Sequence, residues 1–383
     1  MIPGLAEHYT RFRVTERLLL TGHSHQAWPD VALDGMAEAF QDAAELVDTK
    51  WERAFAKADR VRHGYRALIG DPTAEIALGA STHELVVRFL SALPLREHPR
   101  LVTTDGEFHT LRRQLGRLAE AGLEVVRVPA RPVDDLAERL AAAIDARTAA
   151  VLVSAVLFED ARIVPGLDDL AQAATGTELL IDVYHALGVV PFVAPPRAWI
   201  LGGGYKYLQL GEGNCFLRVP QHAWDWRPVI TGWYAEFSFL DRDAGCDARI
   251  PFAPGAEAFA GATYDPVSHY RAARVLDFFS QHSLTPEALR DSYQCQLAVV
   301  AAAFDSLGAS AAVITRDRDT PLERFGGFLA LRCDRAAELS RELLGRGVHT
   351  DSRGPSLRFG PAPYLSDEQL ERSMAELGAV LAS

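Results

Sequence analysis

A lysine placed among glycines has the clearest potential for chemistry in this sequence. Lys206 lies in WILGGGYKYLQLGEGN, after an apolar run, with three glycines before it and Gly211 and Gly213 after it. A lysine amine can form an imine with an aldehyde, and glycines let the backbone come close to a bound group. A solvated lysine at a strand end is the ordinary alternative. Taken alone, Lys206 indicates a covalent site only weakly.

An aspartate and a histidine precede this lysine in a second apolar segment, ELLIDVYHALG. Asp182 stands 24 residues before Lys206 (206 − 182), and His185 follows it in the next turn. A carboxylate at the end of an apolar strand is costly unless a cation compensates it. The protonated ring nitrogen of pyridoxal phosphate (PLP) is such a cation, and PLP also carries an aldehyde. An Asp that only caps the turn is the alternative, but it leaves His185 unexplained.

Two more strand ends carry residues suited to the same ligand. Ser81-x-x-Glu84 opens an amphipathic helix as a capping box, which is a sufficient structural reason for both residues. The N–H groups there and the hydroxyls of Ser81 and Thr82 also suit a phosphate. Phe108, in TTDGEFHT, could lie flat on a pyridine ring, although a buried core Phe is the commoner outcome. Tyr205 and Tyr207 could supply a hydroxyl to the phosphate.

Short apolar runs alternate with amphipathic runs between about residues 75 and 220, and this alternation must position these residues. EIALGA, RLVTTDG and EVVRVPA are each followed by a helical pattern, and AAVLVSAVLF, ELLIDVYHA, WILGGG and NCFLRV read as further buried strands. Such alternation predicts an α/β fold with a mainly parallel sheet covered on both faces. The carboxyl ends of its strands, where ligands bind, would gather the residues above.

Helical patterns flank this region. One long helix or two is expected from Pro29 to Leu68, and another after Pro266 through Phe279. The C-terminal part predicts a compact α+β unit: FGGFLALR, a helix over residues 335–346, GVHTD, SLRFG, and a last helix from Ser366.

Composition excludes several classes of function. The 383 residues carry a net charge of −12, which argues against nucleic acid as a partner. No apolar run approaches the roughly 20 residues of a membrane span, so we expect a cytoplasmic protein without a membrane partner. The cysteines have no metal-ligand spacing and are expected to be free buried thiols, with no metal site. They are Cys215, Cys246, Cys295 and Cys333.

With these residues in view, the sequence resembles the class V aminotransferase superfamily of fold-type I PLP enzymes, and within it kynureninase. The D-x-x-H-A stretch of that family is similar to residues 182–186, and its PLP-lysine signature is similar to residues 202–207. The resemblance implies that Asp182 binds the pyridine nitrogen, His185 lies beside the ring, Tyr205 contacts the phosphate and Lys206 forms the Schiff base.

The same resemblance extends to further cofactor-binding positions. The aromatic-led F-P-[ST]-D segment is similar to residues 108–111, and G-W-F is similar to residues 232–234, whose Trp in the family reaches the phosphate from a neighbouring subunit. A homodimer with shared active sites is therefore implied. The cofactor-binding set is Ser81, Thr82, Phe108, Thr110, Ser154, Asp182, His185, Tyr205, Lys206, Trp233 and Thr263, with Lys206 and Asp182 as the catalytic residues.

For the substrate, the tail RGVHTDSRGPSLRFGPAPYLS is similar to the kynureninase tail. Arg358 would clamp the substrate carboxylate, as a planar fork suits two parallel hydrogen bonds, whereas Arg353 could instead be structural. His25 is expected at the substrate, although His23 and His25 could also be paired surface histidines. The family patterns are not kept at residues 157–161, at residues 23–26 or after Tyr234.

The expected fold is PLP fold-type I: a large domain over residues 45–262 with a mostly parallel seven-stranded sheet, and a smaller α+β domain from residues 1–44 and 263–383. The first functional hypothesis is kynureninase-like hydrolytic Cβ–Cγ cleavage of an amino acid. The alternative is a class V aminotransferase, epimerase or β-lyase. A desulfurase is less favoured, because Cys333 lies in an apparent strand (FLALRC), and a non-catalytic protein is disfavoured by the presence of Lys206 and Asp182.

Overall fold

A seven-stranded sheet forms the centre of the computed structural model, which describes residues 2–240 and 250–382. Its strands are β2 (Glu75–Gly79), β3 (Arg100–Thr104), β4 (Glu124–Val128), β5 (Thr148–Ser154), β6 (Glu178–Asp182), β7 (Trp199–Gly203) and β8 (Cys215–Val219). They lie in the order β2-β8-β7-β6-β5-β3-β4. Only β8 runs antiparallel to its neighbours, so the predicted mostly parallel α/β sheet is confirmed.

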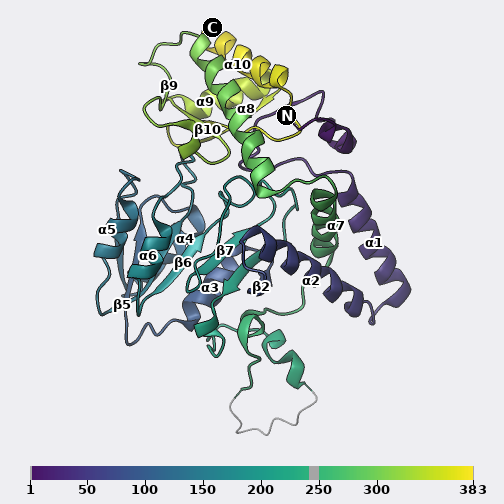
Figure 1. Ribbon diagram of the computed structural model, residues 1–383, viewed down its shortest axis with the longest axis vertical. Coiled ribbons are helices and arrows are strands. Elements are labelled where there is room, and N and C mark those ends of the chain that lie inside the picture. Colours follow the sequence, from purple (N-terminus) through teal and green to yellow (C-terminus); the bar gives the residue numbers. More distant parts are fainter. Residues whose placement is uncertain (1, 241–249, 383) are drawn as a thin grey trace.

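Helices cover this sheet because its strands are apolar on both faces. All seven residues of β5 are buried, as are all five of β7. Strands of this kind need helices on both sides. Those between the strands are α3 (Thr82–Ala92), α4 (His109–Glu120), α5 (Leu136–Ala142) and α6 (Leu167–Ala173), shown in Figure 1.

Three longer helices lie beside the sheet. The pattern over residues 29–68 forms two helices, α1 (Val31–Leu46) and α2 (Trp51–Leu68), and the pattern after Pro266 forms α7 (Val267–Gln281). They lie together at one side of the molecule (Figure 1). A Cβ at Gly35 would come within 2.7 Å of the Tyr270 carbonyl oxygen, so the absence of a side chain there lets α1 approach α7 closely.

The C-terminal part is the compact α+β unit that the sequence predicts. A four-stranded antiparallel sheet has the order β12-β13-β10-β9. Its strands are β9 (Thr315–Arg316), β10 (Leu329–Arg332), β12 (Asp351–Arg353) and β13 (Ser356–Phe359). Helices α8 (Pro286–Ser306), α9 (Ala336–Gly345) and α10 (Asp367–Ala382) lie with this sheet at the top of Figure 1. The division into domains at residues 45 and 262 stays a prediction.

The N-terminal segment joins this C-terminal unit. β1 (Leu18–Leu19) pairs in parallel with β11 (Val348–His349). Further along, Gly22 N donates to the Gly360 carbonyl at 2.9 Å. The beginning and the end of the chain are thus packed together.

The helices and the cysteines bear on two expectations from the sequence. Among the described residues, no helix is both long and apolar enough to cross a membrane. Cys215 and Cys333 are buried, but Cys295 is exposed, so the expectation of buried thiols is wrong there. Cys333 directly follows β10 and does not lie inside it. Cys246 lies outside the described residues.

Candidate functional site

Lys206 lies three residues beyond the end of β7, with its amine enclosed by aromatic rings. Its side chain is 6% exposed. Its Nζ is 5.3 Å from the centroid of Phe108 and 5.2 Å from that of Tyr184, and it is 2.6 Å from Nε2 of His185. The direction of this hydrogen bond depends on the histidine tautomer. The structure therefore brings Lys206, Phe108 and His185 together as predicted.

Burial changes the proton equilibrium of this amine. Removal of the ammonium from water lowers the pKa of Lys206 to about 7, against the opposing charge of Asp182. Burial also lowers the pKa of His185 well below its usual value, helped by the charge of Lys206. A large share of Lys206 is therefore a free amine near neutral pH, which is the form that attacks an aldehyde.

Asp182 is the last residue of β6, as the sequence predicts. Its Oδ1 accepts a hydrogen bond of 2.8 Å from the Tyr184 backbone N–H, which holds the carboxylate at the strand end. Burial raises the pKa of Asp182 to about 6, while the Tyr184 hydrogen bond and the charge of Lys206 lower it. A cation placed against Asp182 would favour its ionised form.

The start of α3 has the predicted cap, but only one half of the capping box. Ser81 Oγ accepts from the Glu84 N–H at 3.4 Å. The Glu84 carboxylate pairs with Arg88 at 3.1 Å instead of returning to Ser81. The Thr82 N–H faces the Cys215 thiol, whose pKa burial raises to about 12. The start of α3, which carries Ser81 and Thr82, thus lies next to Cys215, the first residue of β8.

Ser154 ends β5 and is engaged with a residue that the sequence prediction omits. Its hydroxyl is 2.6 Å from Oε2 of Glu107, and its N–H donates to Glu107 Oε1 at 3.2 Å. Ser154 also pairs in register with Asp182. Thr110 lies in the first turn of α4, and no hydrogen bond of the described residues links its side chain to Lys206.

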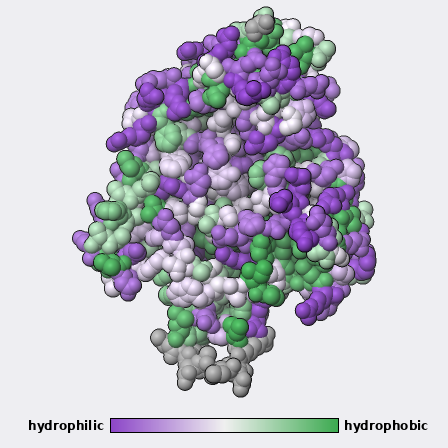
Figure 2. Space-filling view, turned by 180° about the vertical axis from the view of Figure 1, so that it is seen from behind, coloured by the Kyte–Doolittle hydropathy of each residue, from purple (hydrophilic) through white to green (hydrophobic). Residues whose placement is uncertain are grey.

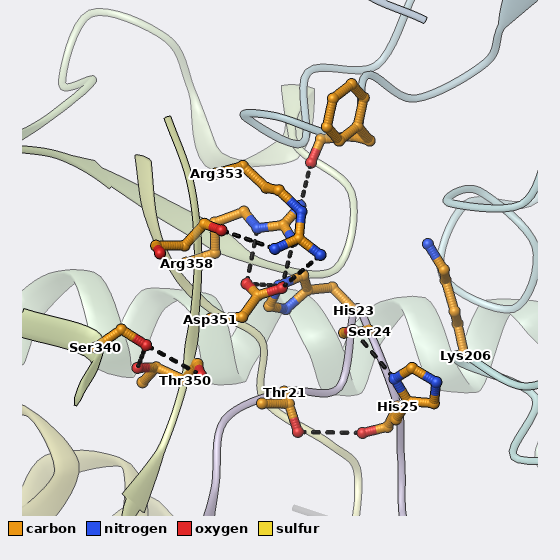
Figure 3. A network of polar contacts seen from close by, with 12 residues as sticks. Thr21, His23, Ser24, His25, Lys206, Ser340, Thr350, Asp351, Arg353 and Arg358 are labelled. Atoms are coloured by element: carbon orange, nitrogen blue, oxygen red, sulfur yellow. Dashed lines mark hydrogen bonds and ion pairs between the residues drawn. The ribbon is translucent and has the colours of Figure 1, made fainter. Parts of the chain in front are cut away.

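Arg358 is buried and already has a carboxylate partner. It is 3% exposed, and its Nε donates to Asp351 Oδ1 at 2.8 Å while its Nη2 donates to Oδ2. Its Nη1 donates to the Phe158 carbonyl. His23 binds the same Asp351 through Nε2 at 2.7 Å, and Figure 3 shows the three side chains together. Arg358 is therefore not a bare cation awaiting a substrate.

Arg353 is the more accessible cation of this cluster. Its side chain is 41% exposed, and its Nη2 is 3.7 Å from Asp351 Oδ2. Its charge lowers the pKa of Lys206, His185 and His109, although burial is the largest cause for each. Figure 3 shows the guanidinium of Arg353 and the amine of Lys206 on facing sides of the same space.

The two N-terminal histidines have different places. His23 is fully buried, and burial lowers its pKa to about 4, so the surface alternative is wrong for it. His25 is 63% exposed, and its ring stacks on Tyr205 with centroids 4.8 Å apart and planes 19° apart. Since Tyr205 adjoins Lys206, His25 lies at the edge of the site, as Figure 3 shows.

The remaining predicted positions lie elsewhere within one chain. Trp233 is 42% exposed and contacts Tyr234, which in turn bonds the exposed Thr263. No contact among the described residues joins either to Lys206. Tyr207 is buried against Tyr293 of α8, with ring centroids 5.4 Å apart, so it packs in the core instead of facing a ligand.

Three residues of the site were missing from the sequence prediction: Tyr184, Glu107 and Asp351. Glu107 directly precedes Phe108, and Asp351 opens the Arg-rich tail segment. An acid beside an expected ring-stacking residue was the available signal for Glu107. Asp351 could be assigned to the site only from the pairing of β12 with β13, which places it opposite Arg358.

Comparison with known proteins supports the fold. No family model matches the chain. It is 24% identical over 351 residues, 89% of this chain and 88% of the other, to the uncharacterized aminotransferase YcbU of Bacillus subtilis (strain 168). Among solved structures it is similar to a mutant of the cystine C–S lyase C-DES with glycine covalently linked to the PLP cofactor, with a TM-score of 0.83, 14% identity and coverage of 97% and 98%.

A second solved structure agrees. The apo cysteine desulfurase from Thermococcus onnurineus NA1 has a TM-score of 0.82 at 16% identity, over 100% of this chain and 98% of the other. The fold is therefore that of the fold-type I PLP enzymes. The similar proteins reported above are named as an uncharacterized aminotransferase, a cystine C–S lyase and a cysteine desulfurase.

Proposed function

We propose that this chain is a PLP-dependent enzyme of the class V aminotransferase type that acts on a small amino acid. The observation that carries the proposal is the buried Lys206 amine, 2.6 Å from His185 and lined by Phe108 and Tyr184. A lysine is almost never fully buried unless it is paired, and Lys206 has no carboxylate ion-pair partner among the described residues. Its low pKa suits a residue that forms an imine and then moves a proton.

The chemistry of the side chains fits PLP at this place. Lys206 supplies the amine, Asp182 supplies a carboxylate for a ring nitrogen, and the start of α3 supplies Ser81 and Thr82 for a phosphate. Gly203 also has to lack a side chain: a Cβ there would lie 2.6 Å from the Tyr184 hydroxyl and 2.7 Å from Cys215 Sγ. The donor set supports a bound ring and phosphate, and Gly203 lets the end of β7 pack against Tyr184 and Cys215.

The roles of the residues follow from their positions. Bound PLP would supply an acceptor for the electrons released at Cα of the substrate. Lys206 would bind the aldehyde until the substrate amine takes its place there, and the amine released in this way would hold the Cα proton. Arg358 and Arg353, with Asp351 between them, would orient the substrate carboxylate, since the three side chains together carry one net positive charge.

Transamination or β-elimination is the reaction that we propose. The similar proteins comprise an aminotransferase by name, a C–S lyase and a cysteine desulfurase, which supports the alternative over kynureninase-type hydrolysis. The segment where the kynureninase pattern is lost, residues 157–161, includes Phe158, whose carbonyl binds Arg358. The pocket therefore differs from the kynureninase pattern beside the carboxylate site.

Covalent binding of PLP is the first test. Lys50, Lys57 and Lys206 are the lysines of the sequence, so borohydride reduction followed by peptide mapping can assign the attachment site. We expect a visible absorbance band with wild-type protein and PLP, label on Lys206, and loss of both in Lys206→Ala. Lys50→Ala is the matched control and should behave as wild type. Absence of the band from wild-type protein with excess PLP would refute the proposal.

The reaction class needs a separate assay. We would supply the loaded protein with cystine and cysteine, with amino-donor and keto-acid pairs, and with kynurenine. Pyruvate and sulfide release would indicate elimination, and conversion of the keto acid would indicate transamination. Fluorescent anthranilate from kynurenine would instead restore the kynureninase hypothesis.

A homodimer is part of this proposal. Six exposed apolar residues lie in or next to the segment that carries Trp233, and Figure 2 shows hydrophobic atoms directly above the grey atoms of its lower end. A partner that covers them could bring Trp233 and Thr263 to the second site. The six are Val229, Ile230, Trp233, Phe237, Leu240 and Ile250, which are 42–83% exposed.

A further inference from the structure

Glu107 is a buried carboxyl group to which the roles above assign nothing. It lies between β3 and α4, next to Phe108, and is 1% exposed. Burial of a carboxylate without compensation is costly, so a buried Glu is kept where its contacts have a use.

Its hydrogen bonds tie together the ends of two strands. Oε1 accepts from Thr104 Oγ1 at 2.7 Å and from the Ser154 N–H at 3.2 Å, and Oε2 accepts from Ser154 Oγ at 2.6 Å. Thr104 Oγ1 in turn accepts from the Gly106 N–H at 3.1 Å, which leaves its proton for Glu107. Three donors around one carboxyl group suit its ionised form, which accepts only.

This bridge adjoins the strand that carries Asp182. Thr104, Ser154 and Asp182 end β3, β5 and β6, which are neighbours in the sheet, and Ser154 pairs directly with Asp182. The Ala155 N–H also donates to the Asp182 carbonyl at 2.9 Å. A shift of Ser154 would therefore shift the Asp182 backbone.

The charges around Glu107 are unbalanced. The titratable groups near these three strand ends are Asp182 at the end of β6, His185 in the next turn and Lys206 after β7. No Lys or Arg of the described residues forms an ion pair with Glu107. Burial, and the charge of Asp182, raise the pKa of Glu107 to about 7. Two neighbouring carboxyl groups with so few compensating charges favour the binding of a cationic group at this end of the sheet.

We propose that Glu107 is a positioning residue for the PLP ring. It fixes the Asp182 strand end through Ser154, and its buried charge strengthens the hold of Asp182 on a protonated ring nitrogen. This inference rests on the proposed function, because the cation that it invokes is that of bound PLP.

Glu107→Gln tests the inference, because it keeps the shape and removes the charge. We would measure the dissociation constant for PLP by fluorescence quenching, and the pH midpoint of the absorbance change of bound PLP. Loss of one nearby negative charge should lower this midpoint, because the protonated form loses stabilisation, and should weaken PLP binding about tenfold. Asp105→Asn is the matched control, since Asp105 is exposed in the same loop and binds the Ala130 N–H instead.

A midpoint equal to that of wild type would overturn the inference, as would equal changes in Asp105→Asn. A lower melting temperature with an unchanged midpoint would also overturn it, since a merely structural bridge predicts that result. If Glu107→Gln does not fold, Ser154→Ala replaces it: weaker PLP binding supports the bridge, and an unchanged dissociation constant contradicts it. If wild-type protein binds no PLP, the proposed function fails instead.

Discussion

At the scale of single residues, burial decides which charges the site can use. Lys206 lies in an environment that favours its neutral form, whereas Arg358 forms an ion pair with Asp351. His23 and His185 are both neutral near physiological pH, since burial lowers the pKa of each. The site thus holds a reactive amine beside a fixed, partly compensated cation.

The pKa of Lys206 predicts how fast PLP attaches at different pH values. Burial lowers this pKa to about 7. The fraction of Lys206 in the free-amine form therefore rises about tenfold per pH unit below that value and approaches one above it. The attachment rate, measured by stopped-flow absorbance relative to N-acetyl-lysine, should rise between pH 6 and 8 and then level off. A rate that still climbs in parallel with the model amine toward pH 10 would contradict an enclosed, neutral Lys206.

The Asp351 and Arg358 pair predicts a large loss of stability when it is broken. Asp351→Asn leaves a buried guanidinium without a charge partner, which destabilises by about 3–5 kcal/mol in urea unfolding. Glu338→Gln, in the exposed pair with Arg335, is the control and should change stability much less, because exposed ion pairs contribute little.

This difference should depend on pH in a definite direction. The hydrogen bond from His23 and the Arg358 charge hold the pKa of Asp351 well below its usual range, against the effect of burial. The pair therefore adds stability above about pH 4, and the gap between wild type and Asp351→Asn should narrow below it. A gap that stays constant down to pH 2.5 would argue against the ion pair as its source.

At the scale of elements, four strand ends and one helix start do the positioning. Phe108 follows β3, Ser154 and Asp182 end β5 and β6, and Lys206 follows β7. These positions could be predicted because hydrophobic periodicity is local and the carboxyl ends of parallel strands meet. Long-range partners could not: Asp351 meets His23 across 328 residues, and nothing in either segment specifies the other.

One element was missed although its signal is local. The sequence prediction omits α8, yet Thr285 caps it, Pro286 occupies its first turn, and Leu289, Tyr293 and Leu297 follow at a spacing of four residues. A Thr-Pro start followed by that spacing predicts a helix. The packing of Tyr207 against α8 was hidden by the same omission.

The start of α3 predicts a selective effect of its cap. Ser81→Ala should destabilise the fold by about 1 kcal/mol and weaken PLP binding, because a hydrogen-bonding group at the proposed phosphate site is lost. At the start of α8, the Thr285 side chain accepts a hydrogen bond from the Ala288 N–H at 3.2 Å. Thr285→Ala removes this equivalent cap and should reduce the stability of the fold without weakening PLP binding. Affinity for pyridoxal, which lacks the phosphate, should not change in either variant. Equal losses for PLP and pyridoxal in Ser81→Ala would disprove a phosphate role.

At the scale of the whole molecule, a partner subunit would account both for the exposed apolar surface and for the lack of contact between Trp233 and Lys206 among the described residues. The segment that carries Trp233 and the other exposed apolar residues lies at the opposite end of Figure 1 from the C-terminal unit. An exposed apolar patch of this kind marks an interaction surface more often than a solvated one. A two-fold dimer would let each patch complete the other site.

Ile230→Asp should therefore give monomers with weaker PLP binding. Ile230 is 54% exposed, as is Leu344 of α9, so Leu344→Asp is a control of equal exposure on another surface. Sedimentation velocity of wild type and Leu344→Asp should show a dimer, and Ile230→Asp about half that mass. A wild-type monomer that binds PLP tightly would rule out the shared site.

The pairing of β1 with β11 also bears on how the chain is made. Leu18 lies against Val348, so the N-terminal strand emerges from the ribosome long before its partner has been synthesised. The central sheet is complete at Val219 and can fold first, since domains generally fold as units during synthesis. The cluster of His23, Asp351 and Arg358 can close only when the last strands are released. A newly made chain would thus hold the Lys206 end of its site before the carboxylate end exists.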